Sequence, residues 1–248
     1  RQAKRRFRWG GMSSEEENDF GEGDEGDSFA ESFEPAVLED GRSPEQVPDP
    51  FKLVDESSGA KFWEWMIAPC PLDTFMNDIW ERRPLYISRE GLPDYFKGWH
   101  SMSDIHHLID NVGMQYTFNV DVKRYVGSER QTLNHNDDGT TNKADPEVVW
   151  RRYQKEGCSV RLLHPQRWCD PLYRMLLACE RYWQCATGCN VYLTPPGTQG
   201  FPPHYDHIDA FILQLEGKKH WRVYAPRCPE EVLPRLPPTD HFQQGEHG

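Results

Sequence analysis

The last third of the sequence alternates short apolar runs with proline- and glycine-rich breaks, and this alternation constrains the fold more than any other feature. Residues 190–194 (NVYLT) carry β-branched and aromatic side chains, which are typical of a strand. A loop at 195–203 (PPGTQGFPP) follows them. Residues 209–217 and 219–226 are two further apolar runs around a Gly-Lys turn, which predicts a β-hairpin.

The preceding part of the sequence has helical signatures. Apolar side chains recur at helical spacing within residues 61–113, where Ser103 is a candidate N-cap and Gly113 a candidate C-cap. Two Asp-Pro pairs, at Asp145 and Asp170, predict helices in which Asp is the N-cap and Pro the first helical residue.

Two further segments, residues 115–126 and 158–164, are strand-like because they are rich in aromatic and β-branched residues. Helices around short antiparallel strands predict the α+β class, with N-terminal helical elements and a jelly-roll type barrel.

Charge divides the chain into three parts that sum to the net charge of −12. Residues 1–11 carry five basic and no acidic side chains, residues 12–60 balance to −14, and residues 61–248 to −3. Residues 1–60 are therefore predicted to be a disordered tail, first basic and then acidic. This tail is either a solvated linker or an attractor of basic partners such as histones or ribosomal proteins. Its basic start is a weak candidate for a nuclear address or an RNA contact.

The cysteines and the lack of long apolar runs bear on the compartment. The seven cysteines form no CxxC pair, which argues against a disulfide scaffold or a zinc ribbon and favours a reducing compartment. No signal peptide and no run of eighteen apolar residues is visible. We expect a soluble intracellular protein that does not bind membranes.

The stretch HYDHIDAF (204–211) is a candidate metal site. On a strand, His204 and Asp206 point the same way, so an imidazole and a carboxylate can clamp one edge of a metal. As a bare pattern, HxD is equally compatible with a solvated strand end. Lys219 favours the metal interpretation, because a lysine within an otherwise apolar strand needs an anion, which a dicarboxylate cosubstrate supplies. Lys218 is the alternative inward-pointing lysine, because the turn leaves the alternation of side chains open.

The run NVYLTPPGTQGFPPHYDHIDAFILQLEGKKHWRVYAP resembles the JmjC-domain ribosomal oxygenases, a family of bifunctional lysine-specific demethylases and histidyl-hydroxylases. Residues 61–235 share this resemblance, which implies a JmjC/cupin double-stranded β-helix with Fe(II) and the cosubstrate 2-oxoglutarate. His204 and Asp206 match the family's metal pair, and Lys219 its 2-oxoglutarate lysine. Asn190 and Tyr192 match pocket positions on the preceding strand.

The resemblance also implies a ribosomal protein or histone substrate, a nuclear or nucleolar location, and a homodimer formed through regions absent from this sequence. No direct sequence-specific nucleic-acid binding is expected. The implied third ligand is a histidine roughly 60 residues beyond Asp206, on a later strand of the barrel, where it would complete the facial triad. Residues 61–248 are thus expected to be the N-terminal part and first half of a JmjC domain, truncated at its C-terminus.

Three histidines near or beyond the HxD pair are weak candidates for the missing ligand. His207 faces away on a strand, and His241 and His247 follow without a strand pattern. Two alternatives to an oxygenase therefore stay open: a catalytically inactive JmjC fragment that acts only in binding, and a zinc-binding structural module. Lys219 disfavours the second, because a structural zinc site needs no buried cation nearby.

Overall fold

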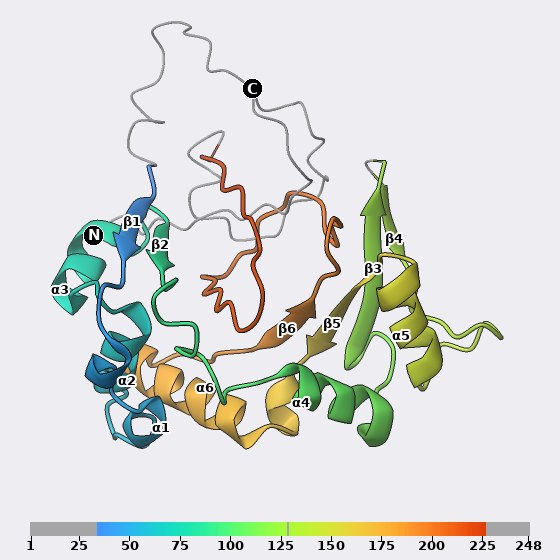
Figure 1. The fold of residues 1–248 in the computed structure, drawn as a ribbon, viewed down its shortest axis with the longest axis horizontal. Coiled ribbons are helices and arrows are strands. Elements are labelled where there is room, and N and C mark those ends of the chain that lie inside the picture. Colours follow the sequence, from blue (N-terminus) through green and yellow to red (C-terminus); the bar gives the residue numbers. More distant parts are fainter. Residues whose placement is uncertain (1–33, 128, 227–248) are drawn as a thin grey trace, which may run out of the picture.

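The computed structural model describes residues 34–127 and 129–226. Figure 1 shows α1, α2 and α3 with the paired strands β1 and β2 on one side, and the larger sheet with α4 and α5 on the other. The elements are, in chain order, β1 (Ala36–Glu39), a 3-10 turn (Pro44–Gln46), α1 (Pro50–Leu53), α2 (Ala60–Ile67), α3 (Leu72–Thr74) with a π-helical turn (Phe75–Ile79), β2 (Leu85–Ser88), α4 (Met102–His107) with a π-helical turn (Leu108–Val112), β3 (Val120–Val126), β4 (Glu129–Thr132), α5 (Pro146–Lys155), β5 (Ser159–Leu163), a 3-10 turn (Pro165–Arg167), α6 (Asp170–Trp183) and β6 (Asn190–Leu193).

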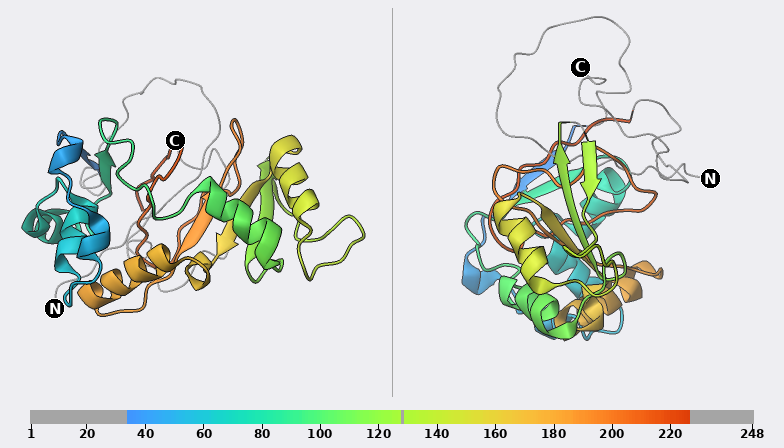
Figure 2. Two further views of the ribbon diagram at one scale, coloured as in Figure 1. Left: turned by 60° about the horizontal axis from the view of Figure 1, so that its bottom comes forward. Right: turned by 90° about the vertical axis from the view of Figure 1, so that its right-hand side faces the viewer.

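Two sheets organise these elements. The larger sheet is antiparallel in the order β4-β3-β5-β6, and β1 pairs with β2 in parallel. Helix α6 runs along the bottom of Figure 1 and spans the distance between the helical side and the sheet. The segment that follows β6 passes between these two sides, as the views in Figure 2 also show.

Two apolar clusters form the core. The first is rich in aromatic side chains and lies among α2, α6 and the segments around them, where Phe62 and Trp63 are 0% and 1% exposed. The second lies against one face of the larger sheet, where Val120 and Val160 pack with side chains of α4 and α5. Val191 of β6 packs against both clusters, so β6 links the helical part to the sheet.

The predicted helices are present, and their starts differ in detail from the prediction. Helix α5 begins as predicted, because Asp145 accepts a hydrogen bond from Glu147 N at 2.9 Å. Helix α4 is capped by Ser101 rather than Ser103, in a capping box with Asp104. Helix α6 includes Asp170 as its first residue, so the prediction of Asp170 as N-cap was wrong by one position.

The strand predictions hold for the segments that find partners in the sheet. Strands β5 and β6 lie within the predicted segments, and β3 occupies the second half of residues 115–126. The predicted hairpin at 209–226 was wrong, because no strand is assigned within residues 194–226. A two-stranded hairpin is marginal without neighbouring strands. The described residues therefore form an α+β fold with an open four-stranded sheet and a separate two-stranded one, and they do not by themselves confirm the jelly roll.

Residues 34–60 are ordered, which corrects the prediction of a disordered tail up to residue 60. Strand β1 pairs with β2, and Asp40, 5% exposed, forms hydrogen bonds of 2.8 and 2.7 Å with Arg42. Arg89 lies 3.7 Å from the same carboxylate. The acidic composition hid these paired charges and the short apolar alternation of β1. Residues 1–33 lie outside the described residues.

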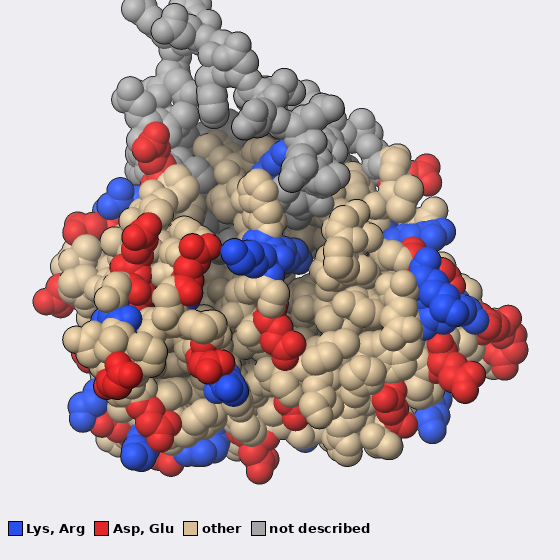
Figure 3. Space-filling view, in the orientation of Figure 1, with Lys and Arg blue, Asp and Glu red and all other residues tan. Residues whose placement is uncertain are grey.

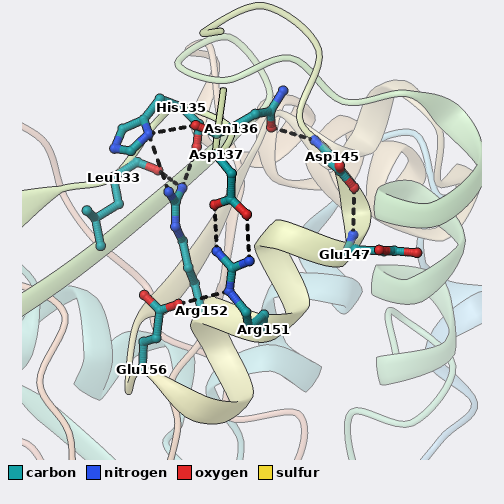
Figure 4. Close-up of polar contacts among 9 residues, drawn as sticks. All are labelled: Leu133, His135, Asn136, Asp137, Asp145, Glu147, Arg151, Arg152 and Glu156. Atoms are coloured by element: carbon teal, nitrogen blue, oxygen red, sulfur yellow. Dashed lines mark hydrogen bonds and ion pairs between the residues drawn. The ribbon is translucent and has the colours of Figure 1, made fainter. Parts of the chain in front are cut away.

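The loop between β4 and α5 is held by a polar network (Figure 4). Arg152 is 4% exposed and donates to the carbonyl oxygens of Leu133 and His135. Arg151 binds both carboxylate oxygens of Asp137 at 2.7 Å. Two arginines of α5 thus anchor a loop that has little apolar surface to bury.

A search for membrane-spanning helices among the described residues found none of sufficient length and apolar character.

Candidate functional site

The two predicted pocket residues, Asn190 and Tyr192, lie on the same face of β6. Both are exposed, while the alternate residues Val191 and Leu193 point to the apolar clusters. Tyr192 is 47% exposed and pairs in register with Arg161 of β5. The structure therefore places these two side chains together, on the sheet face opposite the second apolar cluster.

A row of charged side chains continues this face across the sheet, and sequence reasoning missed it. Asp121 of β3 pairs in register with Arg161, which donates to its Oδ2 from Nε at 3.0 Å and also from Nη2. Lys123 lies 3.2 Å from the same oxygen, and Asn134 donates to Oδ1 at 2.7 Å. The signal in the sequence was the alternation V-D-V-K at 120–123, which puts valines on one face and charges on the other.

The carboxylate of Asp121 is held in its ionised form although it is only 4% exposed. Burial by itself raises its pKa, but hydrogen bonds from Asn134 and Arg161 and the charge of Lys123 outweigh that effect and lower it. Burial, followed by the charge of Arg161, lowers the pKa of Lys123. The cluster has two cations for one carboxylate, so it presents an excess of positive charge.

The loop that leads to the HxD pair packs directly on this polar face. Tyr125 N donates to the carbonyl oxygen of Gln199 at 2.9 Å, which ties the loop to β3. Gly200 lies so close to β5 that an added Cβ would be 2.5 Å from Ser159 Oγ. Only glycine permits this approach.

Phe201 is the contact point between the loop and the polar face. Its ring centroid lies 5.7 Å from that of Tyr192 and 6.1 Å from that of His204. The ammonium of Lys123 lies 5.3 Å and the guanidinium carbon of Arg161 5.6 Å from the same centroid. A cation near an aromatic face is attracted to it, so Phe201 couples the charged row to the loop.

A backbone contact fixes which ring nitrogen of His204 carries the proton. Its Nδ1 lies 2.8 Å from the carbonyl oxygen of Pro202. A carbonyl oxygen only accepts, so Nδ1 carries the proton and Nε2 keeps its lone pair in the neutral ring. Ligating histidines in metal sites have this arrangement, with the second nitrogen bonded to a carbonyl or carboxylate.

Of the other candidate ligands, the structure describes Asp206 and His207. Asp206 is exposed, and the segment 204–206 is not a strand, so the predicted alternation of its side chains is not established. Within residues 34–127 and 129–226, no group of three or more His, Cys, Asp and Glu side chains is arranged to hold a metal. His207 is exposed and has an interaction partner of its own. His241 and His247 lie outside the described residues.

Lys219 is exposed, whereas the sequence predicted a lysine enclosed by an apolar strand. Partial burial of its ammonium nevertheless lowers the pKa of this group. It lies 4.6 Å from the ring centroid of Trp221, and no described carboxylate pairs with it. Lys218 instead lies 3.5 Å from Glu90, so the two lysines differ in their surroundings. The face seen in Figure 3 is hollowed near its centre, and Lys or Arg side chains lie at this hollow.

The chain is similar to known proteins over most of its length. Residues 161–247 match the family model described as JmjC domain. The chain is 43% identical over 188 residues to ribosomal oxygenase 1 of Danio rerio, covering 76% of this chain and 33% of that protein. It is 42% identical over 190 residues to the bifunctional lysine-specific demethylase and histidyl-hydroxylase NO66 of Aedes aegypti, covering 77% and 29%. Identity to human ribosomal oxygenase 1 is 41% over 189 residues, covering 76% and 28%.

The match of residues 161–247 to the JmjC domain defines the class of the protein as a JmjC-domain protein. Within that class, the chain belongs to the ribosomal oxygenase family. It spans about a third of the length of these relatives.

Proposed function

We propose that this chain contributes to an Fe(II)- and 2-oxoglutarate-dependent dioxygenase that hydroxylates a histidine of a ribosomal protein, demethylates a histone lysine, or does both. The observation that carries the proposal is the hydrogen bond from His204 Nδ1 to the Pro202 carbonyl, which leaves Nε2 free for a metal. The names of the relatives, histidyl-hydroxylase, lysine-specific demethylase and ribosomal oxygenase, support the choice of reactions.

The donor set fits part of an iron site. His204 and Asp206 would supply two ligands of the two-histidine, one-carboxylate type, and the third histidine is not among the described residues. When bound, iron and 2-oxoglutarate supply the oxidising chemistry that a protein side chain lacks.

The remaining predicted residues would bind and orient organic groups. Lys219, which has no carboxylate partner among the described residues, would bind the far carboxylate of 2-oxoglutarate. Asn190 and Tyr192 would donate hydrogen bonds to bound groups from the polar face of β6.

The alternative is a catalytically inactive JmjC chain that acts only in binding. The two-ligand donor set of the described residues supports it, because a lone His-Asp pair holds iron weakly. For either function we propose a nuclear or nucleolar location, on the strength of the basic residues 1–11. We also propose ribosomal protein or histone partners, on the strength of the acidic residues 12–60 and the relatives' names.

Anaerobic titration of Fe(II), with and without 2-oxoglutarate, into the 248-residue chain and into a longer protein that contains it tests the proposal. In the form that supplies all three iron ligands, we expect 2-oxoglutarate to tighten iron binding, and admission of oxygen to yield succinate. His204→Ala should abolish both effects, and Lys219→Met should abolish only the response to 2-oxoglutarate. Lys218→Met is the matched control, because Lys218 pairs with Glu90. Iron binding that is absent, or unaffected by His204→Ala, would contradict the proposal and favour the binding-only alternative.

A further inference from the structure

The charged row on the polar sheet face consists of Asp121, Lys123 and Arg161, whose side chains are largely shielded from solvent. Asp121 is 4% exposed, and the side chains of Lys123 and Arg161 are 14% and 23% exposed. A buried ion cluster is weak evidence for stability, because apolar side chains of similar volume often stabilise a fold as well or better. The cluster therefore calls for a role other than holding the sheet together.

The charged row is connected through Phe201 to His204 of the candidate metal pair. The cations of Lys123 and Arg161 both lie near the ring of Phe201, which in turn contacts the ring of His204. The chain path is equally short, since Phe201 precedes His204 by three residues. The loop is also tied to β3 through the Tyr125–Gln199 hydrogen bond.

We propose that Asp121, Lys123 and Arg161 are positioning residues that act through Phe201 to hold His204 with Nδ1 on the Pro202 carbonyl. Asp121 fixes the two cations, the cations hold the Phe201 ring, and the ring restricts the loop 199–204. His204 then keeps one tautomer, with Nε2 available. The role of this orientation in metal binding rests on the proposed function. The orientation of His204 itself can be measured without a metal.

The first test is the tautomer of His204 in the metal-free 248-residue chain, read from long-range ¹H–¹⁵N correlation spectra of ¹⁵N-histidine-labelled protein. In the wild type we expect the Nδ1-protonated form. Asp121→Asn should shift the His204 signals toward a mixture of both tautomers. Amide hydrogen exchange at Gln199, Gly200, Phe201 and His204, the residues of this segment that carry an N–H, should rise about tenfold, the size expected when one charge-assisted pair is lost.

Asp40→Asn is the matched control, because Asp40 is similarly buried and also paired with arginine, but it lies beside β1 and β2. It should leave the His204 signals and residues 199–204 unchanged. The proposal is overturned if Asp121→Asn behaves like Asp40→Asn at His204. It is also overturned if exchange rises equally in β3, β5 and the loop, which would indicate a purely structural role.

Phe201→Leu provides a second route in case Asp121→Asn fails to fold. This variant keeps every charge and removes only the ring, so it should produce the same mixture of His204 tautomers. Unchanged His204 signals would overturn the proposal. Adding Mn²⁺ to the wild type separates the two hypotheses: absence of broadening at His204 counts against the metal function, and the tautomer result still decides the positioning role.

Discussion

The two faces of the larger sheet are built from the same strands but consist of opposite kinds of side chain. On one face, Val120, Val122, Val160 and Leu162 are 0–2% exposed and pack into the second apolar cluster. On the other, Asp121, Lys123 and Arg161 form the charged row beside Tyr192. Because successive residues of a strand alternate between faces, one short sequence serves both purposes. The apolar face stabilises the fold, and the polar face carries the charged row and Tyr192 beside the candidate site.

The largest expected difference between the faces is in the cost of removing a side chain. Leu162→Ala empties a fully buried position and should lower the free energy of unfolding by about 2–5 kcal/mol. Leu163→Ala is the matched control, since Leu163 is half-buried and points to the opposite face. Urea denaturation of both variants measures the difference, and equal losses would remove the distinction between the faces.

The apolar face was largely predictable from the sequence, and the polar row was not. Caps and apolar periodicity predicted α4 and α5, and β-branched residues predicted β5 and β6. Strand β4 (ERQT) has no apolar signal of its own and forms because it pairs with β3.

The candidate site was also only partly predictable from the sequence. The local pattern identified His204, Asp206 and Lys219, whereas the contact between Asp121 and Arg161 joins residues 40 positions apart and depends on the register of β3 with β5. Local pattern cannot specify that register. It also predicted strands at 209–226 that need partners outside the described sheet.

The close approach of the loop to the polar face gives the next largest effect. Gly200→Ala would place a Cβ 2.5 Å from Ser159 Oγ and 2.6 Å from Ser159 Cβ, so the loop or β5 must shift. We expect a loss of about 1–3 kcal/mol in unfolding free energy. Ser159→Gly in the same chain should restore most of it, because it removes both atoms. Denaturation of the single and double variants measures the rescue, and an additive double variant would show that the contact is not the cause.

Acid should weaken the polar face in a way that depends on Asp121. Its folded pKa is lowered, so its contribution to stability is fully present above the unfolded pKa of about 3.9 and is lost as pH falls through the folded pKa. At neutral pH, Asp121→Asn should cost about 1–3 kcal/mol. Urea denaturation from pH 7 to pH 3 should show the gap between wild type and variant narrowing below about pH 4. A gap independent of pH would mean that the carboxylate charge is not what stabilises the face.

Tyr192→Phe should give the smallest change in stability, which would distinguish the polar face of the sheet clearly from the apolar face. Tyr192 is 47% exposed, and its ring contact with Phe201 survives the loss of the hydroxyl. The unfolding free energy should therefore change by less than about 0.5 kcal/mol. If the polar face serves binding, the same variant should weaken 2-oxoglutarate-dependent succinate formation, since only the donor group is lost. A stability loss comparable with that of Leu162→Ala would instead assign Tyr192 to the core, and the two faces of the sheet would no longer differ in purpose.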